Sequence, residues 1–185
     1  VGQGTMAAVL GLSDEDVKAV CAEAAQGEVV EAVNFNTPGQ VVIAGHVSAV
    51  NRACELAKAQ GAKRALVLSV SAPFHSSLLK PASDRLQAYL SDIPFVSPTI
   101  PVINNADVAV ETEPAKIKDA LVRQAAGPVR WVETIQQLSA QGITHVIECG
   151  PGKVLSGMTK RINRDLVGES INDITSLNQV MELLK

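Results

Sequence analysis

Apolar and polar residues in the first 70 positions follow two alternating periods. Between Ser13 and Gly27, apolar residues recur three and four positions apart, which predicts a helix with Ser13 as its N-cap and Asp16 completing a capping box. A second helix is predicted from Ser48, as its cap, to Gly61. Short apolar runs between these helices predict strands, at residues 5–10, 29–36, 40–44 and 64–70. The predicted order, β-α-β-β-α-β, is the ferredoxin-like arrangement.

Strands and helices alternate differently after residue 70. Helices are expected up to about residue 90 and over residues 114–125, 129–140, 153–164 and 177–184, with a Pro-marked edge strand over residues 99–103. Residues 143–148 form an apolar run with little alternation, which predicts a strand buried on both faces. The chain is therefore expected to be α/β, with a ferredoxin-like small subdomain at residues 1–70 and an α/β lobe with a parallel sheet at residues 71–185.

Composition narrows the classes of function. The formal net charge of −3 gives no reason to expect nucleic-acid binding, and no apolar run has the length that a membrane span requires. The cysteines, Cys21, Cys54 and Cys149, are odd in number and lack metal-ligand spacing, which favours a reduced, cytoplasmic environment without a metal site. The sequence does not begin with Met and reads like the interior of a longer chain.

Two sets of polar residues are candidates for chemistry. His75 follows a strand and opens a helix, where a neutral imidazole can act as a general base; the alternative is a histidine satisfied by local hydrogen bonds. Asn34 and Asn36 alternate along a predicted strand, so their amides are expected to share a face, with Val33 and Phe35 on the other. The amides either orient a carboxylate or carbonyl, or form the polar end of a hairpin.

Two further features admit alternatives of the same kind, and a third is excluded. Gln124 lies on the predicted buried face of its helix, where it either supports a functional site or only contributes to packing. A helix is predicted to follow Gly150-Pro151-Gly152-Lys153. This segment either binds an anion at the N-terminus of that helix or is only a tight turn. Ser48 is not a nucleophile, because Gly-x-Ser-x-Gly spacing is absent around it.

Several stretches, in order and nearly end to end, resemble bacterial malonyl-CoA:acyl-carrier-protein transacylases. They are residues 4–8 (GTMAA), 33–45 (VNFNTPGQVVIAG), 61–64 (GAKR), 72–76 (APFHS), 102–105 (VINN) and 150–155 (GPGKVL). The resemblance implies a ferredoxin-like subdomain joined to the C-terminal part of an α/β-hydrolase-like acyltransferase subdomain. This implied fold agrees with the arrangement expected from the periodicity.

The resemblance also implies roles for residues of the catalytic centre. His75 matches the catalytic histidine, and Gln124 the residue whose backbone carbonyl orients it. Phe74 matches a position where a bulky side chain disfavours a branched acyl group, and so implies malonyl over methylmalonyl. Asn34 and Asn36 match asparagines that line the substrate site.

Two more implied roles lie outside that group. Val154 is implied to contact the substrate. Lys63 and Arg64 are implied to belong to the surface that meets the acidic carrier protein, although an ordinary solvated pair explains them equally well.

The implied reaction is ping-pong acyl transfer from malonyl-CoA to the phosphopantetheine thiol of acyl carrier protein in fatty-acid biosynthesis. It needs no metal or cofactor beyond the CoA thioester substrate. The family's Gly-His-Ser-x-Gly nucleophile motif and its malonyl-binding arginine have no counterpart here, so this chain alone is expected to be inactive. The alternatives are a non-catalytic ferredoxin-like binding module on an α/β scaffold, or an acyltransferase domain of a larger polyketide or fatty-acid synthase.

Overall fold

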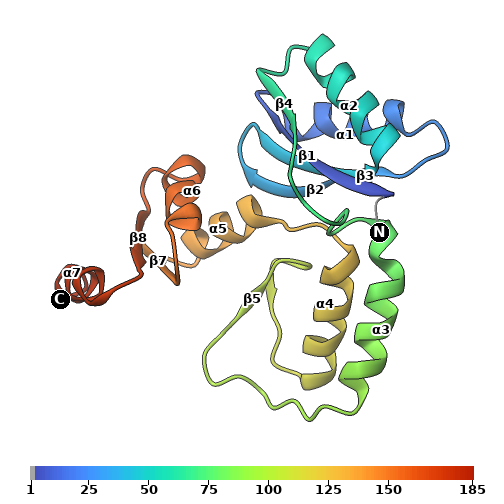
Figure 1. The fold of residues 1–185 in the computed structure, drawn as a ribbon. Coiled ribbons are helices and arrows are strands. Elements are labelled where there is room, and N and C mark those ends of the chain that lie inside the picture. Colours follow the sequence, from blue (N-terminus) through green and yellow to red (C-terminus); the bar gives the residue numbers. More distant parts are fainter. Residues whose placement is uncertain (1–2) are drawn as a thin grey trace. The chain divides into compact units, whose positions relative to one another are not determined.

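The computed structural model describes residues 3–185 and divides the chain into two compact units, Val1–Trp131 and Val132–Lys185 (Figure 1). The first unit contains β1 (Gly4–Leu10), α1 (Asp14–Ala25), β2 (Val30–Thr37), β3 (Gln40–His46), α2 (Val47–Ala59), β4 (Arg64–Val67), the 3-10 helix η1 (Ser77–Leu79), α3 (Lys80–Ser91), β5 (Ile103–Asn104), β6 (Ala109–Val110) and α4 (Pro114–Ala126). Helix α5 (Trp131–Ala140) begins at the boundary, and β7 (His145–Cys149), α6 (Val154–Ile162), β8 (Val167–Ile171) and α7 (Ile174–Leu183) follow.

A four-stranded antiparallel sheet with the order β2-β3-β1-β4 forms the N-terminal part of the first unit. Helices α1 and α2 cover one face of this sheet (Figure 1). Alternate residues of the central strands, such as Val9 and Ile43, are buried against apolar helix residues such as Val17 and Val50. The element order is the one predicted from the sequence, because the helical and strand periods are both clear in this stretch.

The two predicted helix caps have different outcomes. The hydroxyl of Ser13 accepts the backbone N–H of Asp16 at 3.1 Å, which confirms it as the N-cap of α1. Ser48 is not a cap, because α2 begins at Val47 and its N-cap is His46. The Ser48 hydroxyl instead donates to the carboxylate of Glu28 at 2.6 Å.

Two β-bulges interrupt β2, between Ala32 and Asn34 and between Phe35 and Thr37. Strict alternation therefore fails, and the expectation that Val33 and Phe35 share a face is wrong. Val33 belongs to a small apolar cluster on the sheet face opposite the helices, whereas Phe35 packs against the helix-covered core. A bulge adds a residue without a partner, which changes the face of every residue after it.

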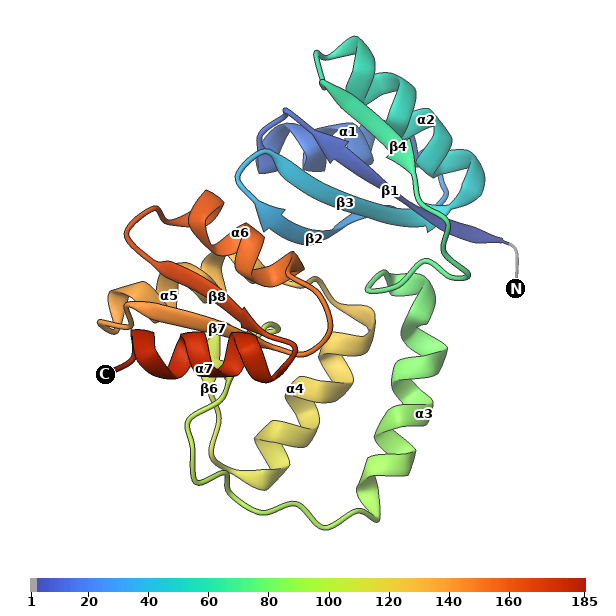
Figure 2. The ribbon, with the colours of Figure 1, turned by 60° about the vertical axis from the view of Figure 1, so that its left-hand side comes forward.

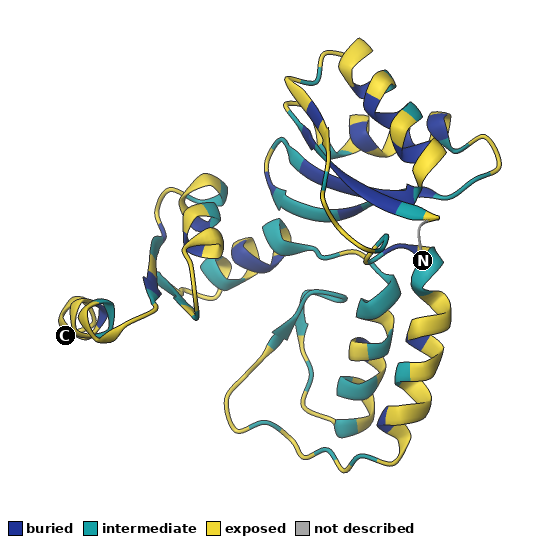
Figure 3. Ribbon diagram, in the orientation of Figure 1, coloured by how far each residue is buried: buried dark blue, intermediate teal, exposed yellow. Residues whose placement is uncertain are grey.

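The C-terminal part of the first unit contains the helices α3 and α4, which pack against each other. The strand predicted over residues 99–103 is limited to Ile103–Asn104, which pairs with Ala109–Val110 in a short hairpin. Pro98 and Pro101 lack the N–H that a longer ladder would need. Buried residues are concentrated in the four-stranded sheet and its helices, while α3 is largely exposed and α4 is mostly half-buried (Figure 3).

The second unit is built around the parallel pair of β7 and β8, with α6 and α7 against β8 (Figure 2). Strand β8 was not expected, because Gly168, Glu169 and Ser170 give it no apolar run. Strand β7 was expected to be buried on both faces, and this expectation is wrong for the described residues, since none of its side chains is fully buried. Gly168 lets α6 approach closely, because a Cβ there would lie 2.7 Å from the backbone oxygen of Ser156.

The two compact units meet between Trp131 and Val132, so they do not test the predicted subdomain boundary at residue 70, which stays a prediction. None of the helices in residues 3–185 combines the length and the apolar composition that crossing a bilayer demands.

Candidate active site

His75 lies in the loop between β4 and η1, and its ring is tied to helix α4. Its Nδ1 is 3.0 Å from the backbone oxygen of Gln124, which confirms the predicted contact between these two residues. A carbonyl oxygen can only accept a hydrogen bond, so Nδ1 must carry the proton of the neutral ring. The lone pair is then on Nε2, and this atom is the one that can act as a base.

The backbone at His75 is in the left-handed region, with φ of +64°. For a residue with a side chain this conformation costs energy and persists only where neighbouring contacts enforce it. The contacts come from the next two residues: the buried Ser76 donates its hydroxyl to the Pro73 carbonyl at 2.7 Å. Ser77 donates its N–H and its hydroxyl to the carboxylate of Glu31, at 2.8 and 2.7 Å.

Gln124 supplies its backbone carbonyl from the last turn of α4. The last four carbonyls of a helix have no partner within the helix, which leaves this oxygen available to His75. The side chain of Gln124 donates to the Pro128 carbonyl at 3.1 Å, so it points toward the residues that follow the helix. A Cβ on Gly127 would lie 2.7 Å from the Arg123 oxygen, so glycine permits this tight exit from the helix.

The apolar stripe of α4 was expected to be buried, and in the described residues it is not. Ile117 and Gln124 are half-buried and Leu121 is 44% exposed. These residues line a cavity of about 400 Å³ together with the loop that contains Phe95 and Val102.

Asn34 lies close to the segment that follows Gln124. The N–H of Phe35 donates to the Val129 carbonyl at 3.0 Å, and the N–H of Val129 donates to the Val33 carbonyl at 2.8 Å. Asn34 and Val129 therefore form a parallel bridge at the open edge of β2. The structure thus connects the strand of Asn34 and Asn36 with the helix end that contacts His75.

The other predicted site residues lie in different places. Phe74 precedes His75 and is 42% exposed. Lys63 and Arg64 are exposed, Lys63 just before the edge strand β4 and Arg64 as its first residue. Val154 is the first residue of α6 in the second unit, and it is exposed.

A carboxylate of the chain itself lies at the N-terminus of the helix that follows the Gly150–Lys153 turn. The carboxylate of Glu148 accepts the N–H of Ser156 at 2.9 Å. This hydrogen bond holds the pKa of Glu148 below its usual value. A carboxylate of the chain itself therefore satisfies a free N–H at the start of α6.

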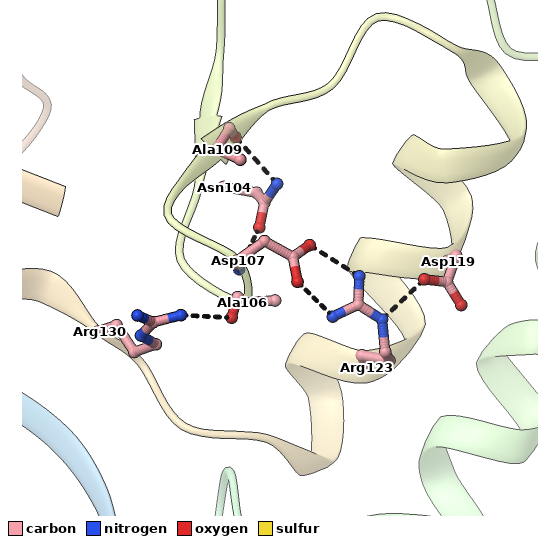
Figure 4. Close-up of polar contacts among 7 residues, drawn as sticks. All are labelled: Asn104, Ala106, Asp107, Ala109, Asp119, Arg123 and Arg130. Carbon is pink, nitrogen blue, oxygen red and sulfur yellow. Dashed lines mark hydrogen bonds and ion pairs between the residues drawn. The ribbon is translucent and has the colours of Figure 1, made fainter. Parts of the chain in front are cut away.

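Sequence reasoning missed the polar groups that surround these residues. Arg123, next to Gln124, donates both terminal nitrogens to Asp107 at 2.7 Å and its Nε to Asp119 at 2.7 Å (Figure 4). The spacing of Asp119 and Arg123 on one helix could have suggested their ion pair. No local pattern points to the pairing of Asp107 with Arg123, or of Glu31 with Ser77.

The fold and this histidine site agree with the comparison with known families. The profile of the acyl transferase domain matches residues 1–180, and the chain belongs to this family. It is 52% identical over 182 residues to the malonyl CoA-acyl carrier protein transacylase of Escherichia coli (strain K12), which covers 98% of this chain and 59% of that protein. The transacylase of Bacillus subtilis (strain 168) is 44% identical over 185 residues, 100% of this chain and 58% of its own length.

Solved structures give the same result. The acyl-carrier-protein S-malonyltransferase of Burkholderia pseudomallei 1710b matches with a TM-score of 0.97 and 64% identity, over 98% of this chain and 59% of that one. A malonyl-transacylase solved in complex with its type II PKS acyl-carrier protein matches with a TM-score of 0.97 and 49% identity, over 98% of this chain and 59% of that one. The chain thus spans about three fifths of the length of the relatives it matches.

Proposed function

We propose that the protein containing this chain transfers a malonyl group from malonyl-CoA to the phosphopantetheine thiol of acyl carrier protein, in fatty-acid biosynthesis. The observation that carries the proposal is the contact between His75 Nδ1 and the Gln124 carbonyl, which leaves Nε2 as a base. The proposal is supported by the relatives, because those described above are named as transacylases or transferases of malonyl groups.

In the first half-reaction, a serine hydroxyl attacks the thioester carbonyl while His75 Nε2 takes its proton. The C–S bond breaks, the CoA sulfur takes the proton from His75, and a malonyl-serine ester remains. In the second, the phosphopantetheine thiol gives its proton to His75 and attacks this ester, and the serine oxygen regains the proton. No Gly-x-Ser-x-Gly occurs in these 185 residues, so we assign the serine to sequence outside them.

The remaining predicted residues take their roles in this reaction. Asn34 and Asn36 border the acyl group; both residues are half-buried, and Asn34 pairs with Val129 in the segment that follows Gln124. Phe74 limits branching of the acyl group, because it is adjacent in the chain to His75. Val154 contacts the substrate from the start of α6.

Lys63 and Arg64 form the surface for the acidic carrier protein. Both are exposed, and in the described part of the chain no ion pair engages either of them. A basic rim accelerates encounter with an acidic partner and contributes less to the chemical step. The relative solved with its acyl-carrier protein supports a direct contact of this kind.

The same proposal includes the finer description of the fold. The strand order β2-β3-β1-β4 with two helices on one face supports a ferredoxin-like subdomain over residues 1–70. Residues 71–185 are then the C-terminal part of an α/β-hydrolase-like subdomain. A cytoplasmic location and a reaction without metal or cofactor complete the proposal.

The test is acyl transfer by the native full-length protein. Incubation with malonyl-CoA should add one malonyl group to a serine, detected by mass spectrometry, and holo acyl carrier protein should then remove it. His75→Ala should abolish both steps. Absence of any malonyl adduct in the wild-type protein would overturn the proposal in favour of a non-catalytic module, and transfer to the carrier without a covalent adduct would overturn the ping-pong order.

A further inference from the structure

The Gln124 carbonyl sets the tautomer of His75, so its position must be fixed, yet it lies at a helix end with few buried contacts. Of the residues in α4, only Ala120 is fully buried. The last turn of a helix frays readily, because its carbonyls lack partners. Polar contacts therefore add to the packing against α3 in holding this turn: the hydroxyl of the buried Ser83 donates to the Val122 carbonyl at 2.7 Å, and the N–H of Val129 donates to the Val33 carbonyl at 2.8 Å.

The hairpin of β5 and β6 contacts that turn through Arg123, and its loop is closed by hydrogen bonds of its own. The side chain of Asn104 accepts the N–H of Asp107 at 2.8 Å and donates to the Ala109 carbonyl at 3.0 Å, which closes the loop from both ends. The N–H of Val108 also donates to the Asn104 carbonyl at 3.0 Å. This loop contains part of the stretch 102–105, whose role the proposed reaction does not explain.

Two arginines on either side of Gln124 attach to this hairpin (Figure 4). Arg123 binds Asp107 through both of its terminal nitrogens at 2.7 Å, a geometry that fixes orientation as well as distance. Arg130 donates to the Ala106 carbonyl at 3.4 Å. The segment between the two arginines, with the Gln124 carbonyl in it, is thus held at both ends by neighbouring residues of one loop.

We propose that Arg123 and Asp107 are positioning residues that hold the Gln124 carbonyl against Nδ1 of His75. The bidentate pair fixes the last turn of α4 to the hairpin, and the carbonyl of the next residue keeps its direction toward the ring. When the pair is lost, the turn moves, the Nδ1 proton loses its acceptor, and Nε2 no longer holds the lone pair in a fixed direction. The catalytic consequence rests on the proposed function, whereas the effect on the ring does not.

The test compares Asp107→Asn and Arg123→Met with Asp119→Asn as the matched control. Asp119 also binds Arg123 at 2.7 Å, but it lies on α4 itself and does not attach the helix to the hairpin. Long-range ¹H–¹⁵N spectra of the full-length protein report which ring nitrogen of His75 is protonated, and the spectrum of His75→Asn identifies the signals of His75 by their loss. Amide spectra of the four-stranded sheet verify that each variant is folded.

In the wild type and in Asp119→Asn, neutral His75 should be protonated at Nδ1. In Asp107→Asn and Arg123→Met, the ratio of the Nδ1–H to the Nε2–H form should fall several-fold. In the full-length protein, kcat for malonyl transfer should fall about tenfold, with KM for malonyl-CoA changed less than about twofold. Arg123→Lys, which keeps the charge but not the bidentate geometry, should give an intermediate value for both quantities.

An unchanged His75 tautomer in folded Asp107→Asn or Arg123→Met would overturn the inference. An equal change in Asp119→Asn would also overturn it, because a general effect on helix α4 would then explain the result. If Asp107→Asn does not fold, the Arg123→Lys and Arg123→Met series decides by the same criterion. A wild-type protein that transfers no malonyl group would refute the proposed function alone, since the tautomer measurement does not depend on it.

Discussion

Replacing His75 with asparagine separates the base from the hydrogen bond that holds it. The amide nitrogen of asparagine is as many bonds from Cα as Nδ1 of histidine, so it can still donate to the Gln124 carbonyl. Asparagine also tolerates the left-handed backbone of this position, where φ is +64°. It has no lone pair at the place of Nε2. We therefore expect His75→Asn to fold like the wild type and to lack the general base.

The magnitudes follow from the local structure. His75→Ala loses the 3.0 Å hydrogen bond, worth about 1 kcal/mol. The backbone cost largely cancels, because histidine already occupies the left-handed region in the wild type, although it tolerates that region better than alanine does. A destabilisation of roughly 1 kcal/mol should lower the urea midpoint by about 0.5 M. His75→Asn should stay within about 0.5 kcal/mol of the wild type. In both variants, loss of the base should reduce malonyl loading by about 10²- to 10⁴-fold.

The assays are urea denaturation followed by amide signals of the first unit, and malonyl loading of the full-length protein followed by mass spectrometry. His75→Gln is a control, because its amide lies one bond farther out and glutamine does not favour the left-handed region; it should be destabilised like His75→Ala. Near-normal loading by His75→Asn would refute the base assignment. Equal destabilisation of the asparagine and alanine variants would refute the argument from backbone conformation and hydrogen bonding.

Other residues give predictions that can be tested separately. Phe74→Ser should relax discrimination against methylmalonyl-CoA by at most about 1–3 kcal/mol, measured as the ratio of kcat/KM for the two substrates; an unchanged ratio would exclude a steric role. Reversing the charges of Lys63 and Arg64 to glutamate should weaken use of the carrier protein and leave loading from malonyl-CoA nearly intact, whereas equal losses in both half-reactions would point to misfolding. The hydrogen bonds from Arg123 hold the pKa of Asp107 below its ordinary value of 3.8. The stability that this pair contributes is therefore present above pH 3.8 and is lost as the pH falls below it, so wild type and Asp107→Asn should converge in stability in acid; a constant difference would contradict this linkage.

The elements of the first 70 residues could be predicted because their signals are local. The N-cap of α1 needs only Ser13 and the N–H three residues later, and the hairpin of β2 and β3 needs only its turn at Thr37–Gln40. The contact between His75 and Gln124 was expected from the resemblance to transacylases, not from spacing, because 49 residues separate the two.

Features that depend on distant partners could not be read from the sequence. The start of α2 is an example: His46 takes the N-cap position and its Nδ1 accepts the N–H of Val29, 17 residues away. The Ser48 hydroxyl, which a local pattern assigns to capping, finds Glu28 instead. In both cases the side chain binds a partner that is distant in the sequence and becomes close only in the folded chain. The sequence alone shows only the local partners.

The sequence by itself therefore determined the order of elements, the first helix cap and the residues that could supply a base. Only the tertiary structure decided that β2 is bulged, that β8 pairs with β7, and that Arg123 binds Asp107 beside Gln124. The physical reason is the range of the interactions. Caps, turns and periodicity act over a few residues, whereas the direction of a catalytic ring depends on groups that only the folded chain brings within hydrogen-bonding distance.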